Sequence, residues 1–161
     1  VTTSTARSGT ITDSSPTSRT ATTQAPSGPR LSWGDAATLE GRMVTVTKPV
    51  EDANARGAHP GWKAYYCTVT ITNTGDDPLD YSASEFTLEG NSSGSVGTGA
   101  PGIVGDSNPT VGGDPFLKAG TVEPGRSITA VVWFSLDGKD DPVKMRLGTA
   151  TSTGVTLASW Q

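Results

Sequence analysis

Residues 67–81 read CTVTITNTGDDPLDY, and the first half of this stretch alternates between apolar and polar side chains. Extending the alternation back to residue 62 places four apolar or aromatic residues on one face: Tyr65, Cys67, Val69 and Ile71. A period of two predicts a half-buried β-strand, because successive side chains of a strand point to opposite faces. Asn73, Thr74 and Gly75 predict a tight turn with positive φ, and Pro78 excludes further ladder pairing. The stretch therefore predicts one regular strand that ends abruptly.

A second regular strand is predicted at residues 126–134, RSITAVVWF, where Ile128, Ala130, Val132 and Phe134 share a face. Pro-Gly at 124–125 predicts a turn before it, and the Asp- and Gly-rich residues 137–142 predict a turn after it. Shorter alternating runs occur at 42–48, 84–90, 143–147 and 154–160. We count seven or eight short strands and no amphipathic helix. This pattern predicts an all-β fold, an antiparallel β-sandwich or barrel.

Composition divides the chain of 161 residues into a tail and one domain. Residues 1–30 hold 15 Ser or Thr and no aromatic residue, so they predict a disordered Ser/Thr/Pro-rich tether. Three Arg and one Asp give the tail a charge of +2, and the whole chain carries −4, so residues 31–161 carry −6. An acidic domain argues against nucleic acid and against anionic membranes as partners.

The N-terminal segment also bears on export. It has no charged and then apolar signal peptide, and no apolar run of the chain reaches the 18 or so residues of a membrane span. We expect no membrane insertion by the chain itself. A Ser/Thr/Pro-rich tail before a compact domain is typical of a cell-wall or membrane tether, and an artificial leader has a similar composition.

Residues 90–115 interrupt the strand pattern with eight Gly and three Pro. A loop of this length inside a compact domain is either functional or mobile. Val96, Ile103 and Val111 are the apolar residues that either form one short strand or anchor the loop. The sequence does not choose between these two structures.

Three stretches taken in order are similar to a known family. They are YYCTVTITNTGDDPLDYSASEFTLEG at 65–90, VEPGRSITAVVWFSL at 122–136 and DPVKMRL at 141–147. Their shared features are a strand that ends in N-T-G-[DE]-x-P, a Phe-x-Leu pair and a Pro-Gly-x-[ST] turn before an apolar strand. They resemble the secreted immunoglobulin-like domain-of-unknown-function family of Gram-positive lipoproteins and exported proteins, the type of the secreted immunogenic β-sandwich protein of mycobacteria.

This resemblance implies an exported immunoglobulin-like β-sandwich, often anchored by lipid through a Ser/Thr-rich tether. It implies no established activity, so there are no catalytic residues to carry over. The Gly/Ser-rich stretch 90–115 departs from the family pattern, in which an acidic, Gly-containing segment and a Tyr follow the Phe-x-Leu pair.

The residue types that usually carry chemistry are few. Cys67, the single cysteine, falls on the apolar face of its strand, which predicts a buried small hydrophobe rather than a reactive thiol. His59, the single histidine, is expected in a solvated loop, and no GxSxG elbow is present. Asp clusters at 76–80 and 137–141 lack the calcium-loop spacing, so ordinary turn chemistry is favoured over calcium. We therefore expect no catalytic residue, no cofactor and no metal.

The candidate site is a patch for a partner. Tyr66 and Trp133, with Val131, fall on the polar sides of the two regular strands. If those strands are neighbours, an exposed aromatic–aliphatic patch follows, which is typical of contact surfaces for protein or sugar. The alternative is that a loop or the C-terminal strand with Trp160 covers these side chains.

Together these observations predict a non-catalytic binding or adaptor module, extracellular or anchored at the bacterial cell envelope. Its expected partner is a protein or, failing that, a glycan. One alternative is a carbohydrate-binding β-sandwich that uses exposed Trp and Tyr, and weaker alternatives are a calcium-binding domain and a hydrolase. The sequence is silent on ligand identity, oligomeric state and lipidation.

Overall fold

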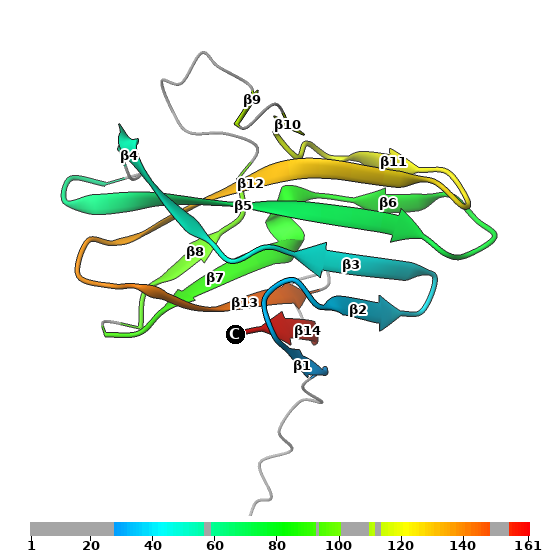
Figure 1. The fold of residues 1–161 in the computed structure, drawn as a ribbon, viewed down its shortest axis with the longest axis horizontal. Helices are drawn as coiled ribbons and strands as arrows, with labels where there is room; N and C mark the ends of the chain where they lie inside the picture. Colours follow the sequence, from blue (N-terminus) through cyan, green and yellow to red (C-terminus); the bar gives the residue numbers. More distant parts are fainter. Residues whose placement is uncertain (1–27, 57–58, 93, 101–109, 112–113, 149–154) are drawn as a thin grey trace, which may run out of the picture.

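The computed structural model describes residues 28–56, 59–92, 94–100, 110–111, 114–148 and 155–161. Within these residues the chain forms fourteen strands and one short 3-10 helix, Ala83–Glu85. Most strands belong to two five-stranded sheets that stack as the layers of a sandwich (Figure 1). The predicted all-β, immunoglobulin-like β-sandwich is therefore confirmed.

The first layer, here named the β13 sheet, has the order β1-β14-β13-β7-β8. Its strands are β1 (Arg30–Leu31), β14 (Thr156–Trp160), β13 (Pro142–Gly148), β7 (Phe86–Gly90) and β8 (Val96–Thr98). The second layer, the β5 sheet, has the order β12-β5-β3-β2, and β4 also pairs with β5. Its strands are β12 (Ser127–Asp137), β5 (Trp62–Asn73), β3 (Arg42–Val46), β2 (Ala36–Leu39) and β4 (Val50–Arg56). All pairings in both layers are antiparallel except that of β1 with β14.

Two small pairs complete the described structure, and they correct the expected number of strands. β6 (Leu79–Tyr81) pairs with β11 (Gly120–Val122), and β9 (Thr110–Val111) pairs with β10 (Asp114–Pro115). The expected seven or eight strands are too few because most of the missed strands have two to four residues, too few to show alternation, and the seven residues of β4, VEDANAR, do not alternate regularly between apolar and polar side chains. The long alternating runs are where the sequence placed them.

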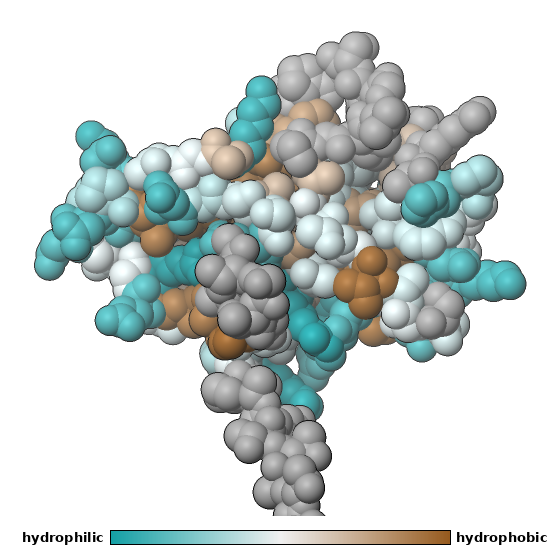
Figure 2. Space-filling view, turned by 180° about the vertical axis from the view of Figure 1, so that it is seen from behind, coloured by the Kyte–Doolittle hydropathy of each residue, from teal (hydrophilic) through white to brown (hydrophobic). Residues whose placement is uncertain are grey.

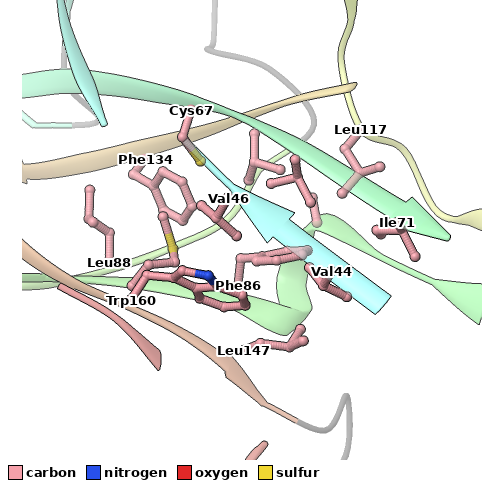
Figure 3. Close-up of a cluster of buried hydrophobic side chains, with 14 of the residues drawn as sticks. Val44, Val46, Cys67, Ile71, Phe86, Leu88, Leu117, Phe134, Leu147 and Trp160 are labelled. Carbon is pink, nitrogen blue, oxygen red and sulfur yellow. The ribbon is translucent and has the colours of Figure 1, made fainter. Parts of the chain in front are cut away.

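The core lies between the two sheets and contains the predicted inward faces. Val69, Ile71 and Val132 are fully buried, and Tyr65, Cys67 and Phe134 are almost so. Phe86 and Leu88 from β7 and Trp160 from β14 pack against them from the opposite layer (Figure 3). The indole Nε1 of Trp160 donates a 2.9 Å hydrogen bond to the carbonyl of Asp35, so the largest core side chain keeps a polar partner.

Part of the Gly-rich stretch forms a corner between the layers. β8 pairs with β7, and the next residues cross to the other sheet, where Ala100 exchanges two backbone hydrogen bonds with Trp133. A Cβ on Gly97 would lie 2.6 Å from the carbonyl oxygen of Ser135, and one on Gly99 would lie 2.1 Å from that of Ala83. These glycines are needed because other backbone passes too close for any side chain.

The three apolar residues of that stretch have different outcomes. Val96 lies in β8 but is exposed, and Val111 lies in β9. Ile103 lies outside the described residues. The two short strands replace the single strand considered from the sequence.

Most of the expected tether, residues 1–27, lies outside the described residues. The last residue assigned to it, Arg30, already pairs with Ser159 as part of β1. The boundary between tether and domain at residue 30 stays a prediction. None of the described segments forms a helix long and apolar enough to cross a membrane.

Candidate functional site

The two turn motifs that carry the family resemblance meet in the structure at Asn73. Its side-chain amide donates to the carbonyls of Asp77 and Val122, both at 2.8 Å, and its Oδ1 accepts from the backbone of Gly75 at 2.9 Å. Its backbone pairs with Gly125 and Arg126, in the turn before β12. Asn73 is 1% exposed, so this network is shielded from water. The first motif therefore supplies the amide that joins both turns.

Each glycine of these motifs has a separate physical reason. Gly125 has φ of 71°, a conformation that side chains with a Cβ rarely adopt. Gly75 does not have the positive φ expected from the sequence. A Cβ there would instead lie 3.3 Å from the Cα of Gly41, whose carbonyl accepts the amide hydrogen of Gly75. Close approach of two turns, rather than a left-handed backbone, is what favours glycine at 75.

The expected partner patch is assembled but not exposed. β5 and β12 are neighbours, and Tyr66 stands directly opposite Trp133, with ring centroids 5.3 Å apart. However, Val131 is 0% exposed and Trp133 is 1% exposed, so the expectation of an exposed aromatic–aliphatic patch is wrong. Of the three residues, only Tyr66 reaches the surface, where it is half-buried.

A separate small core covers the patch, as the alternative interpretation proposed. Phe116 packs on Trp133 with ring centroids 5.9 Å apart, and the backbone of Leu117 donates a 2.8 Å hydrogen bond to Val131. The covering residues belong to the segment that leads into β11, not to the C-terminal strand, because Trp160 lies in the main core. The indole Nε1 of Trp133 has no hydrogen-bond partner among the described residues.

Cys67 and His59 occupy the positions expected of them. Cys67 is 1% exposed, and burial raises the pKa of its thiol well above the ordinary value, so the reactive thiolate is disfavoured. His59 is exposed and makes an edge-on ring contact with Trp62, with centroids 4.7 Å apart. The buried thiol confirms the structural interpretation of Cys67.

The Asp-rich turn at 137–141 holds neighbouring turns together. The carboxylate of Asp140 is fully buried and accepts hydrogen bonds from the backbone of Ser92 at 2.7 Å and of Ser95 at 3.2 Å. The hydroxyl of Ser95 also donates to it. Asp137 accepts from the backbone of Lys139 at 3.0 Å. Across the described part of the chain, no three His, Cys, Asp or Glu residues gather where they could hold a metal ion.

The outer faces of the two sheets differ in chemistry. On the β13 sheet, Glu89 forms ion pairs with Lys144, at 2.7 Å, and with Arg146. Figure 2 shows one side of the molecule, where small brown patches are separated by teal and white residues. On the outer face of the β5 sheet, Asp137 lies at the far end, opposite Trp62, but the part formed by β2, β3 and the neighbouring ends of β5 and β12 is uncharged instead. Strand register places there Ala36, Thr38, Met43, Thr45, Thr47, Thr68, Thr70, Thr72, Ser127 and Thr129, which we name the hydroxyl face.

The sequence places Thr68, Thr70 and Thr72 on the polar side of their strand, but alternation alone does not reveal the hydroxyl face. Register aligns Thr70 with Thr129 of β12 and with Thr45 of β3. Two hydroxyl pairs bond across the strands: Thr70 with Thr129 at 3.0 Å, and Thr72 with Ser127 at 2.8 Å. The missing signal was therefore the pairing of strands that lie more than fifty residues apart in the chain.

Comparison with solved structures finds the same fold in bacterial proteins. A secreted protein of Mycobacterium tuberculosis, MPT63, is similar with a TM-score of 0.60 and 14% identity, over 82% of this chain and 95% of that chain. The yjhA protein of Bacillus subtilis is similar with a TM-score of 0.57 and 14% identity, over 81% of this chain and 99% of that chain. These identities support a shared fold and nothing finer.

A third similar structure is longer than this chain. It is a putative lipoprotein, ycdA, of Bacillus subtilis, with a TM-score of 0.54 and 13% identity, over 78% of this chain but 37% of that chain. No curated protein matches the sequence. A family model matches residues 32–156, and the chain therefore belongs to the family described as Domain of unknown function (DUF4352).

Proposed function

We propose that this chain is an exported, non-catalytic binding or adaptor module of the bacterial cell envelope. The observation that carries the proposal is the structural role of its buried polar side chains. Arg42 pairs with Glu85 at 3.3 Å, Asn73 joins two turns and Asp140 holds the backbone of Ser92 and of Ser95. Groups engaged in this way hold the fold and are not free for acid–base chemistry, so function falls to the surface.

Export is supported by the relatives that share the fold. One is a secreted protein of a mycobacterium, and another is a putative lipoprotein of Bacillus subtilis. The Ser/Thr-rich residues 1–30 suit a spacer between an anchor and the sandwich. The module would then present its sheet faces to a protein or a glycan outside the cell.

Localisation tests the first half of the proposal. The natural full-length protein, tagged at its C-terminus, is produced in its own host, and the medium, envelope and cytoplasmic fractions are probed separately. We expect the protein in the medium or in the envelope fraction. Recovery in the cytoplasmic fraction alone contradicts the proposal.

Co-sedimentation tests the second half. The purified chain is mixed with isolated envelopes, before and after protease treatment, and with envelopes whose sugars are oxidised by periodate. Binding lost after protease indicates a protein partner, and binding lost after periodate indicates a glycan. A chain that stays in the supernatant under all three conditions refutes a binding role at the envelope.

A further inference from the structure

The hydroxyl face is a regular array that carries no ionisable side chain. The chain has 28 Lys, Arg, Asp and Glu residues, 12 basic and 16 acidic, yet none of them falls on these ten positions, nine of which lie in four adjacent strands and one, Thr47, directly after β3. Neighbouring strands lie about 4.8 Å apart, and alternate residues of one strand lie about 6.8 Å apart. The hydroxyl groups therefore form rows with two fixed spacings.

Its hydroxyl groups are held in place before any ligand arrives. Thr is β-branched and stiff at χ1. The pairs Thr70–Thr129 and Thr72–Ser127 restrict rotation further through hydrogen bonds of 3.0 and 2.8 Å. A hydroxyl has one donor and two lone pairs, so each bonded pair keeps one donor and three lone pairs for a ligand. Little side-chain entropy remains to be lost on binding.

The chemistry of the face selects its occupant. Protein interfaces are rich in aromatic residues, Met and Arg and poor in Ser and Ala, and of the enriched types the ten positions of this face hold only Met43. An anionic polymer finds no cation on it. A neutral glycan presents hydroxyl groups to the Thr and Ser oxygens and C–H groups to the Thr methyls. Tyr66, half-buried and two residues before Thr68 on the same side of β5, adds a ring edge at one end.

We propose that the hydroxyl face binds a neutral polysaccharide along the strands β12, β5, β3 and β2. This proposal rests on the proposed envelope role, for which it names the ligand class and the surface. It replaces the buried Trp133 with threonine hydroxyls as the sugar contacts, and only Tyr66 remains of the aromatic patch expected from the sequence.

The test is affinity electrophoresis of the whole chain in native gels that contain one neutral polysaccharide each: dextran, soluble starch, xyloglucan or hydroxyethylcellulose. We expect at least one of them to retard the wild type. Thr70→Val/Thr129→Val keeps the shape of both side chains and removes both hydroxyls, so it should weaken that binding by about tenfold or more. Thr70→Ser/Thr129→Ser keeps the hydroxyls and should retain most of the retardation.

The matched control lies on the opposite sheet. Thr87 and Thr98 are also cross-strand partners on an outer face, so Thr87→Val/Thr98→Val makes the same chemical change away from the hydroxyl face. It should migrate like the wild type. Retardation of the wild type by none of the four polysaccharides, or equal loss in both valine pairs, overturns the proposal.

Two further measurements separate this proposal from the envelope role. Envelope co-sedimentation that is unchanged in Thr70→Val/Thr129→Val leaves the envelope role standing and refutes the hydroxyl face as its ligand site. Size-exclusion chromatography detects a second copy as the occupant. If the wild type is a dimer that this valine pair dissociates, and no polysaccharide retards it, the proposal is wrong.

Discussion

Replacing Asn73 tests whether the junction between the two motif turns stabilises the whole fold. Asn73→Ala removes three side-chain hydrogen bonds of 2.8, 2.8 and 2.9 Å from a site that is 1% exposed. Each such bond contributes about 0.5–1.5 kcal/mol net, so together they contribute about 1.5–4.5 kcal/mol to the free energy of unfolding. Domains of this size unfold with about 5–15 kcal/mol, so the loss should be easily measured.

The assay is urea unfolding followed by tryptophan fluorescence, since Trp133 and Trp160 are both buried in the native state. With a slope of about 1–3 kcal/mol per M, a loss of about 3 kcal/mol lowers the midpoint by about 1–3 M. Asn91→Ala is the control, because Asn91 is exposed and the hydrogen bonds that its Oδ1 accepts from the hydroxyl of Ser92 and the backbone of Asp141 are both exposed to solvent. It should change the free energy of unfolding by less than about 1 kcal/mol.

The variant Asn73→Asp sharpens the test through pH. The introduced carboxylate has no N–H to donate and faces the carbonyl oxygens of Asp77 and Val122. Burial and these carbonyls raise its pKa in the folded state above the unfolded value of about 3.9. The contribution of this carboxyl group to stability is then fully present below its unfolded pKa and is lost as pH rises through its folded pKa. Asn73→Asp should therefore be less stable than Asn73→Ala at pH 7 and should recover toward pH 4. The opposite order at pH 7, or a loss below about 1 kcal/mol for Asn73→Ala, refutes the role given to Asn73.

Three other predictions concern buried groups. Burial raises the pKa of the Cys67 thiol in the folded state, so the contribution of this thiol to stability is lost as pH rises above the unfolded pKa of about 8.5. The urea midpoint should therefore fall more between pH 8 and 10 in the wild type than in Cys67→Ala. Parallel pH profiles of the two proteins would contradict this. Gly99→Ala should prevent folding or lower the free energy of unfolding in urea by more than about 2 kcal/mol, because the methyl group of the introduced alanine would lie 2.1 Å from the carbonyl oxygen of Ala83. The control Gly148→Ala, whose methyl group would lie 3.3 Å from its nearest neighbour, should lower the free energy of unfolding much less. Glu85→Leu leaves Arg42 buried without its partner and should lower the free energy of unfolding by about 3–5 kcal/mol in the same assay. The double variant Arg42→Met/Glu85→Leu should recover most of that loss. Equal losses in the single and double variants would show that the ion pair does not matter.

The two layers of the sandwich could be predicted from the sequence because the alternation of apolar and polar residues is a local signal. Val69 and Ile71 point into the core, and so does Phe134, since a period of two separates the two sides of a strand. Alternation does not indicate whether other residues cover the polar side of a strand. Trp133 is buried there by Phe116, which lies in a segment without any regular pattern. That non-local packing is why the expected patch was wrong.

The hydroxyl face and the buried polar groups were missed for a related reason. Thr70 and Thr129 become neighbours only through the register of β5 with β12, which depends on both strands and on the turns at their ends. The pairing of Arg42 with Glu85 needs a strand and a 3-10 helix that are 43 residues apart. Charged residues of this kind are usually exposed, so their burial has no signature in a single sequence.

The corner made by residues 96–100 has a consequence for solubility. The edge of a sheet presents unpaired backbone groups that can recruit strands from other molecules and start aggregates. Ala100 and Leu117 occupy that edge of β12 at Trp133 and Val131, in the middle of the longest run of pairing in the sheet. Gly97 and Gly99 allow the chain to come close enough to do so. The glycines of this corner therefore act against self-association of the protein through the edge of β12.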